Sequence, residues 1–457
     1  MSDTQVTQQT NDITVPQAVG DGLVLRWSTA EDVERIGELA AYVFRQKAEE
    51  PPNAHMVAWM RDLGSGRHPL TTVDQGVLVE DTHTGKVVAS MWLIPITWSF
   101  GGIRFGVGRP EAVATHPEYR RRGLIRALFD AFHARSARAG DLAQAITGIP
   151  YFYRQFGYEM ALELGGGRFV QFDDIPPLKD GETEAYRLQP ATEDDLPFVM
   201  ELYQREQGRS LVSSDIPEAY WHWTLDGMSV ESGEGWTTLL INDLQGAHCG
   251  FVLVRHTRWG KTLDVIQMAV TAGTTWSTPM PSVLRALQAL APQVPTGRDR
   301  ANPSRLLFSF GTAHPAYLVL GDALAPRRDR VYAWYVRIPD LPGFVQHVAP
   351  VLEGRLSASP LAGYSGDVHL DFYRDGLHLH FADGRLTTSE SWRRPIYSSD
   401  LKGAAGFPPL VFLQLLFGRH SRTELEHIFP DVWASDEAGM VLDVLFPPQS
   451  SLVLTLD

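Results

Sequence analysis

The apolar positions of the chain recur with helical spacing in some segments and with strand spacing in others. Val33, Ile36, Leu39 and Val43 lie three or four residues apart, which predicts an amphipathic helix that Thr29 can cap. Further apolar runs predict strands at residues 76–81, 87–100 and 111–115, and a long helix follows them. Helices and strands therefore alternate, which is typical of an α/β fold.

Short segments of the first half recur in the same order in the second half. They are TAEDVERIGEL and TEDDLPFVMEL, LIRALF and VLRALQ, and FYRQFGY and AYLVLGD, which begin at Thr29 and Thr192, Leu124 and Val283, and Phe152 and Ala316. This shared order favours a tandem duplication. The alternative is a chance likeness between short helix starts.

Shifts in composition divide the chain into five parts. The start is polar and lacks periodicity, which predicts a disordered tail, and two stretches rich in Pro, Asp and Gly, FDDIPPLKDGETEAY and RIPDLPGF, predict linkers. The predicted parts are a tail at 1–20, a first domain at 21–171, a linker at 172–186, a second domain at 187–337 and a third domain at 338–457.

The third part has a different, α+β pattern. A helix is predicted at 341–356, and the RDG and ADG steps predict hairpin turns between the strands that follow it. The apolar segments PPLVFLQLLFG and RTELEHIF predict helices. Strands are predicted near the end in MVLDVLF (440–446) and SSLVLTLD (450–457).

Composition narrows the classes of function. The net charge of −14 argues against a nucleic-acid partner, because phosphates attract basic surfaces. No apolar run approaches the roughly 20 residues that span a bilayer, and the polar start is unlike a signal peptide. We therefore expect a cytoplasmic protein without a membrane partner. The single cysteine, Cys249, excludes an intramolecular disulfide and a cysteine-based zinc cluster.

The segment YRRRGLI, at residues 119–125, places three arginines and a glycine where a predicted strand gives way to a helix. The first N–H groups of a helix are unpaired and lie at the positive end of its dipole, where phosphates bind readily. Gly123 lacks the Cβ that would keep a phosphate from the backbone. We expect an anion-binding turn for a pyrophosphate; the alternative is a solvated charged surface.

In its context, ATHPEYRRRGLIRAL, this turn resembles motif A of the GCN5-related N-acetyltransferase (GNAT) superfamily, Q/R-x-x-G-x-G/A. Arg120 takes the first place of the motif and Gly123 its glycine, whereas Ile125 occupies the last small-residue position and departs from the pattern. FYRQFGY, at 152–158, resembles the second signature of the superfamily, aromatic-Tyr-x-x-x-Gly-Phe/Tyr.

The layout of the whole chain resembles the Eis (enhanced intracellular survival) acetyltransferases. These have two GNAT folds in tandem and a C-terminal domain similar to the sterol carrier protein SCP2. The resemblance implies the same three-domain fold, acetyl-CoA as cofactor, an amine acceptor that is a small molecule or a peptide, and a homo-oligomer such as a ring-like hexamer. The specific motifs behind it lie in the first third of the chain.

The resemblance also implies roles for particular residues. The strand before motif A would contact the pantetheine arm of the cofactor, and the turn would hold its pyrophosphate. The implied cofactor-binding residues are Val113, Ala114, Thr115, Arg120, Arg121, Arg122, Gly123, Leu124 and Ile125. Tyr153 matches the tyrosine that protonates the leaving thiolate, a task that suits a phenol with an ordinary pKa of about 10. The alternative for Tyr153 is a core aromatic residue.

A protonated amine must lose a proton before it attacks a thioester, so a base is needed. Glu111 is one candidate, although it is as well suited to be an ion-pair partner of Arg109. Asp457 is the other, because in the Eis family a C-terminal carboxylate reaches the active site. The end of this chain lacks the aromatic residue found there, and the side chain of Asp457 could serve as well as its terminus.

The predicted second domain has no Arg-x-x-Gly turn in QMAVTAGTTWSTPMPSVLRAL, so we expect a scaffold that binds no cofactor. The sequence as a whole predicts an acetyl-CoA-dependent N-acetyltransferase, with aminoglycosides or polyamines among the acceptors. The alternatives are a non-catalytic acyl-CoA sensor or lipid-binding protein on a GNAT scaffold, and transfer of a different acyl group.

Overall fold

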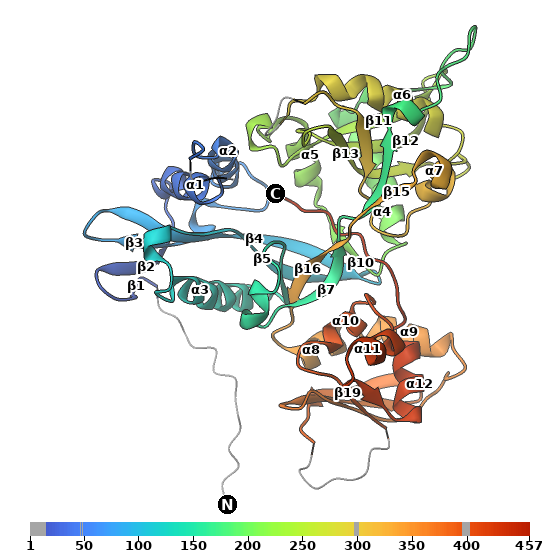
Figure 1. Ribbon diagram of the computed structural model, residues 1–457. Helices are drawn as coiled ribbons and strands as arrows, with labels where there is room; N and C mark the ends of the chain where they lie inside the picture. Colours follow the sequence, from blue (N-terminus) through green and yellow to red (C-terminus); the bar gives the residue numbers. More distant parts are fainter. Residues whose placement is uncertain (1–14, 46, 48, 297–300, 395–402) are drawn as a thin grey trace, which may run out of the picture. The chain divides into compact units, whose positions relative to one another are not determined.

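The computed structural model describes residues 15–45, 47, 49–296, 301–394 and 403–457 (Figure 1). Most of the predicted tail at 1–20 therefore lies outside the described residues. The chain forms two compact units: the first holds residues up to 95 together with 106–144, and the second holds 96–105 and 145–457. Two long strands, β4 (Lys86–Phe100) and β5 (Ile103–Thr115), belong partly to each unit.

The first unit is a sheet with helices. Its strands lie in the order β1-β2-β3-β4-β5-β6, where β1 to β4 are antiparallel neighbours and β5 runs parallel to β6. A parallel pair needs a crossover connection, and here it is α3, which lies beside the sheet in Figure 1. The other elements are β1 (Gln17–Ala18), β2 (Leu23–Trp27), α1 (Asp32–Val43), α2 (Ala54–Leu63), η1 (Val73–Gln75), β3 (Gly76–Asp81), η2 (Pro117–Tyr119), α3 (Leu124–Arg138) and β6 (Ala143–Ile146).

The predicted strands of the first third are confirmed as β3, β4 and β5, and the predicted helices as α1 and α3. The predicted cap of α1 is wrong. Glu31 occupies the cap position, and the carboxylate of Asp32 instead accepts hydrogen bonds from the N–H and the hydroxyl of Thr29, at 2.9 and 3.0 Å. Thr29 is thus a donor to the first turn of the helix, because a carboxylate is the stronger acceptor.

The second unit contains a seven-stranded sheet in the order β15-β8-β14-β13-β12-β11-β9. Strand β8, which precedes the predicted linker, pairs with β14 and β15, which lie far downstream in the sequence. Strand β16, which also lies far downstream, pairs antiparallel with β7. The seven strands of this sheet are β8 (Gly167–Gln171), β9 (Tyr186–Pro190), β11 (Trp236–Asp243), β12 (His248–Arg255), β13 (Thr262–Val270), β14 (Arg305–Phe308) and β15 (Arg327–Asp329). The strands β7 (Glu159–Leu164), β10 (Val212–Asp215) and β16 (Tyr332–Arg337) also belong to the second unit but lie outside this sheet.

Helices accompany this sheet, and the apolar sides of α6 and α7 pack into its core. Cys249 packs against the same core as a partly buried side chain. The helices are η3 (Phe152–Phe156), η4 (Phe172–Asp174), η5 (Glu193–Asp195), α4 (Leu196–Gln207), α5 (Glu218–Asp226), η6 (Val230–Ser232), α6 (Met280–Leu290), η7 (Ala291–Gln293) and α7 (Ala316–Leu324).

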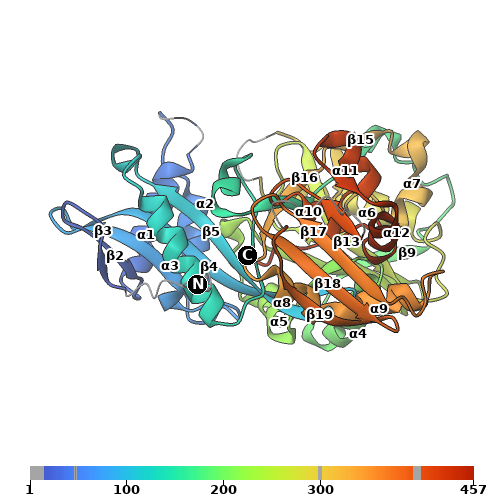
Figure 2. The ribbon, with the colours of Figure 1, turned by 90° about the horizontal axis from the view of Figure 1, so that it is seen from below.

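The last part of the second unit is built on a five-stranded sheet in the order β19-β18-β17-β20-β21, with the β17–β18–β19 meander visible in Figure 2. The predicted RDG and ADG hairpins are confirmed. The elements are α8 (Leu341–His347), α9 (Ala349–Ser357), β17 (Gly366–Asp371), β18 (Gly376–Ala382), β19 (Arg385–Ser391), β20 (Ala404–Gly406), α10 (Phe412–Leu416), α11 (Arg422–Ile428), β21 (Trp433–Ala434) and α12 (Asp436–Leu445).

The two strands predicted near the end are wrong. MVLDVLF belongs to helix α12, because Ser435 caps the helix start through the N–H of Ala438 and the buried residues Val441, Leu442 and Leu445 recur at helical spacing. SSLVLTLD forms no named strand; its only described ladder contact is a bridge between Leu452 and Ser213. The fold is mixed α/β as predicted, whereas the predicted domain limits stay predictions.

Candidate active site

The end of β5, the following turn and the first two residues of α3 contain all the predicted cofactor-binding residues, within the first unit. Ala112 interrupts the strand with a φ of 48°, which is uncommon for a residue with a Cβ. Ala114 and Thr115 are buried, and Val113 is half-buried. The hydroxyl of Thr115 is buried without a hydrogen-bond partner among the described residues.

The turn before α3 leaves the start of the helix open. Arg121 and Gly123 have left-handed φ values of 64° and 78°, and no side chain caps the first N–H groups of α3. A Cβ on Gly123 would meet no described atom within 4 Å, so the space above the turn is open. Arg120 and Arg121 are exposed. These residues fit a phosphate-bearing group, because uncapped N–H groups and guanidinium groups both attract anions.

The turn is anchored on its other side. The hydroxyl of Tyr119 donates a hydrogen bond of 2.6 Å to Asp81, which raises the pKa of Tyr119 and lowers that of Asp81. The exposed Arg122 lies over the ring of Tyr119 and donates to the carbonyl oxygen of Glu118. Arg122 is thereby tied to the turn itself.

Glu111 forms an ion pair. Its Oε1 lies 2.6 Å from Nη2 of Arg109, whose side chain is 2% exposed, and its Oε2 accepts from the N–H of Ala112. The ion pair with Arg109, which is the alternative role predicted for Glu111, is therefore present.

Tyr153 and Asp457 lie in the second unit. Tyr153, in η3, is 4% exposed, and its ring contacts those of Phe152, Tyr158 and Tyr335 with centroids 5.2, 6.4 and 5.6 Å apart. Asp457 is also 4% exposed. Its main-chain oxygen accepts from the hydroxyl of Tyr220 at 3.1 Å, and its Oδ2 lies 3.9 Å from Arg255. Asp457 is therefore buried, with a hydroxyl donor at its main-chain oxygen and a guanidinium group near its side chain.

The predicted duplication aligns Tyr317 with Tyr153 in sequence, but the surroundings of the two tyrosines differ. The hydroxyl of Tyr317 accepts from the N–H of Phe310 at 2.9 Å and donates to the carbonyl oxygen of Phe308 at 2.8 Å, so it holds a loop. The helix that echoes α3 is α6, which begins at Met280 and has Pro281 in its first turn. A proline removes one of the N–H groups that would bind an anion. That this part binds no cofactor stays a prediction.

Two residues that sequence reasoning missed lie close to Tyr153. Tyr332 and Tyr335, both in β16, bond to the loop that precedes it: the hydroxyl of Tyr332 donates to Gly148, and that of Tyr335 accepts from Tyr151, each at 2.7 Å. No local signal could have found them, since these bonds span 184 positions of sequence.

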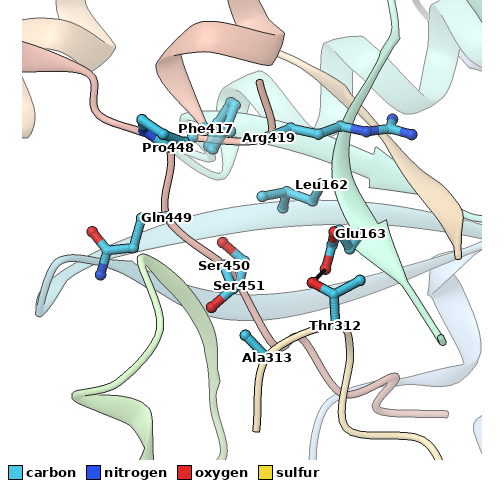
Figure 3. A pocket seen from close by; sticks show the side chains of 11 residues that line it. Leu162, Glu163, Thr312, Ala313, Phe417, Arg419, Pro448, Gln449, Ser450 and Ser451 are labelled. Atoms are coloured by element: carbon cyan, nitrogen blue, oxygen red, sulfur yellow. Dashed lines mark hydrogen bonds between the residues drawn. The ribbon is translucent and has the colours of Figure 1, made fainter. Parts of the chain in front are cut away.

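A cavity of about 290 Å³ lies elsewhere in the second unit (Figure 3). In it, the hydroxyl of Thr312 donates to Glu163 at 2.8 Å. Its lining residues are Leu162, Glu163, Thr312, Ala313, Phe417, Gly418, Arg419, Pro448, Gln449, Ser450 and Ser451. None of them is a predicted site residue, so the cavity is separate from the predicted chemistry.

In the described ranges, no three His, Cys, Asp or Glu side chains are arranged to hold a metal ion. His378 and His380 bond instead to Asp367, at 2.7 and 2.8 Å. No helix in the described part of the chain is both long enough and apolar enough to span a bilayer.

Comparisons with known proteins extend these observations. Residues 25–161 match a family model described as an acetyltransferase (GNAT) domain. Among curated protein sequences, none matches the chain significantly.

Solved structures resemble it over nearly its whole length. A GCN5-related N-acetyltransferase from Anabaena variabilis is 16% identical with a TM-score of 0.65, covering 94% of this chain and 99% of that one. One from Kribbella flavida is 20% identical with a TM-score of 0.62, covering 96% and 99%. Eis1 from Mycobacterium abscessus is 15% identical with a TM-score of 0.57, covering 95% and 99%. The chain thus shares the fold of these proteins, and its residues 25–161 match the model of a GNAT acetyltransferase domain.

Proposed function

We propose that the protein transfers an acetyl group from acetyl-CoA directly to a primary amine of a small molecule, a peptide or a lysine side chain. Aminoglycosides and polyamines are the small molecules to test first. The observation that carries the proposal is the open start of α3, where Gly123 and the uncapped N–H groups follow a run of exposed arginines.

In this proposal the end of β5 and the turn bind the donor. The backbone at Val113 and Ala114 and the hydroxyl of Thr115 contact the pantetheine arm, while Arg120 to Ile125 hold the pyrophosphate. The uncapped start of α3 and the open space above Gly123 support the placement of the pyrophosphate. Acetyl-CoA supplies the acetyl group as a thioester that a neutral amine can attack.

Tyr153 then donates its phenolic proton to the departing sulfur as the carbon–sulfur bond breaks and the carbon–nitrogen bond forms. The proton of the ammonium group goes to a carboxylate before the attack. Glu111 and Asp457 are the candidates, and the ion pair with Arg109 already engages Glu111. Substitution of each carboxylate decides between them.

The remaining features are proposals that follow from the resemblance. They are domain limits at 21–171, 187–337 and 338–457, an SCP2-like third domain, a cytoplasmic location and a homo-oligomer, with a hexamer as the first state to test. Light scattering on the purified protein would establish its mass in solution.

The function is tested by following thiol release from acetyl-CoA with aminoglycosides, polyamines, amino acids and lysine peptides. Turnover above the background without an acceptor supports the transferase and identifies its acceptor class. Calorimetric binding of acetyl-CoA without turnover would favour a sensor, and absence of both would overturn the assignment of the turn. Propionyl-CoA and longer donors measured in parallel report the acyl preference.

A further inference from the structure

The loop that precedes Tyr153, residues 147–151, is held at two points by β16. The hydroxyl of Tyr332 donates to the carbonyl oxygen of Gly148, and the N–H of Tyr151 donates to the hydroxyl of Tyr335, each at 2.7 Å. The loop ends where η3 and Tyr153 begin. Two phenols from a distant strand therefore fix the path of the backbone into η3.

The backbone of this loop contains a strained conformation that its surroundings must hold in place. Tyr151 has a φ of 59°, a left-handed conformation that costs a residue with a Cβ on the order of 1 kcal/mol. Strained conformations of this kind persist only where the surroundings impose them. The Tyr151 N–H donates to the Tyr335 hydroxyl, and the Arg154 guanidinium lies over the Tyr151 ring. The shape of the loop thus depends on Tyr335.

Tyr335 also contacts Tyr153 itself. Tyr335 is fully buried, and the two ring centroids lie 5.6 Å apart at an interplanar angle of 63°. The loop bears on the same tyrosine, since a Cβ added to Gly148 would lie only 3.2 Å from the Tyr153 hydroxyl. A displaced loop would therefore move the hydroxyl or the space around it.

The hydroxyl groups of Tyr332 and Tyr335 lie close together. Their hydroxyl oxygens lie 3.4 Å apart, although residues three positions apart on a regular strand point to opposite faces. The ladder between β16 and β7 shifts register between Trp334 and Tyr335, and such irregularities re-aim side chains. Burial and the bond with Tyr335 raise the pKa of Tyr332, which keeps it a hydrogen-bond donor at neutral pH.

We propose that Tyr335, supported by Tyr332, is a positioning residue that fixes residues 147–151 and so orients the Tyr153 hydroxyl for proton transfer. This inference rests on the proposed function. It adds a requirement of its own, namely that the second half of the chain sets the rate of the reaction through β16. Neither tyrosine exchanges a proton with the substrate in this role.

The test compares the full-length variants Tyr335→Phe, Tyr332→Phe and Tyr317→Phe with the unmodified protein. Tyr317→Phe is the matched control, because its hydroxyl also holds a loop through a backbone N–H but lies in the part predicted to bind no cofactor. We expect Tyr335→Phe to lower kcat about tenfold while the KM for acetyl-CoA stays within about twofold, since misplacement of a reacting group affects the chemical step. Tyr332→Phe should show a smaller decrease in kcat, and Tyr317→Phe none.

Hydrogen exchange supplies a readout that does not depend on activity. In Tyr335→Phe the Tyr151 N–H loses its acceptor, so a peptide that covers residues 147–156 should exchange faster than in Tyr317→Phe. Faster exchange with unchanged kcat would overturn the positioning role alone, and unchanged exchange would overturn the anchoring of the loop. Absence of turnover in the unmodified protein with every amine would overturn the proposed function, and the positioning role with it.

Discussion

The Nη2 atom of Arg109 lies 2.6 Å from Oε1 of Glu111, and 2% of the arginine side chain is exposed. Breaking a buried ion pair from one side leaves a charge without its partner and costs about 3 kcal/mol. Glu111→Gln should therefore lower the midpoint of thermal unfolding and, through this, reduce activity. The loss of activity alone would not make Glu111 the base.

A double variant separates the two roles. Arg109→Met with Glu111→Gln removes both charges, so most of the stability should return. We expect kcat to recover with it to within about threefold, because the double variant no longer contains the buried guanidinium that the Glu111 carboxylate balances. A kcat that stays about 100-fold low in a double variant of normal stability would instead identify Glu111 as the base.

If Glu111 is structural, the other proposed base is Asp457, through its side chain or its terminal carboxylate. Asp457→Asn keeps the shape of the side chain and removes its carboxylate, which Arg255 faces at 3.9 Å. We expect kcat at pH 7 to fall about 100-fold with little change in the KM for acetyl-CoA. The exposed residue Asp383 provides the control, Asp383→Asn. Equal kcat values in the two variants would remove the Asp457 side chain from the mechanism.

Tyr153→Phe tests the proposed acid. The variant keeps the buried ring and its aromatic contacts but loses the phenolic proton, so kcat should fall about 100-fold or more while acetyl-CoA binds as before. Tyr317→Phe is the matched control, since it removes the phenol that the predicted duplication aligns with Tyr153. Calorimetry and thiol release on both variants give the two readouts. An unchanged kcat in Tyr153→Phe would show that another group or water protonates the thiolate.

Gly123→Ala tests the anion-binding turn. At a φ of 78°, an alanine is strained by about 1 kcal/mol, and its Cβ would stand where a phosphate approaches the backbone. We expect the Kd for acetyl-CoA to rise about tenfold. Gly140→Ala, at the other end of α3, has a similar φ of 83° and equally open space, so it carries the strain without the binding role. A similar Kd in both variants would contradict the assignment.

The first third of the fold was predictable because its signals are local. Strand β3 is a short apolar run, β4 is a long one, and α3 starts directly after Gly123 and ends shortly before Gly140. MVLDVLF shows where such signals are ambiguous, because a short apolar run fits a buried strand and a buried helix equally well. Only Ser435 and the acidic residues after it distinguish the start of α12.

Contacts between segments far apart in the sequence leave no such local signal. Strand β8 pairs with β14, and β7 pairs with β16. The sequences of these segments contain no local pattern that predicts either pairing. The same holds for the candidate site: Tyr153 could be recognised from FYRQFGY, whereas Tyr332 and Tyr335 become visible only when β16 lies beside β7. Residues that act through position are thus harder to predict than residues that act through chemistry.

His314 makes the stability of the second unit depend on pH. It is enclosed by the rings of Phe310, Trp276 and Tyr317, and burial, with a smaller effect from the charge of Arg209, lowers its pKa to about 3. In the unfolded chain a histidine titrates at about 6.5, so the unfolded state takes up the proton first as the pH falls. The stabilisation is complete above pH 6.5 and is lost progressively between about 6.5 and 3.

Between pH 7 and 5, the His314 contribution to the free energy of unfolding should fall by about 2 kcal/mol, at 1.36 kcal/mol for each pH unit below 6.5. His314→Phe keeps an aromatic ring among its neighbours and removes this contribution, so the variant should lose less stability than the unmodified protein over the same interval. Replacement of the exposed His427 by Gln provides the control. Urea unfolding at pH 7 and pH 5, followed by tryptophan fluorescence, measures the difference. Parallel losses in His314→Phe and the unmodified protein would mean that His314 can take up a proton without unfolding of its surroundings.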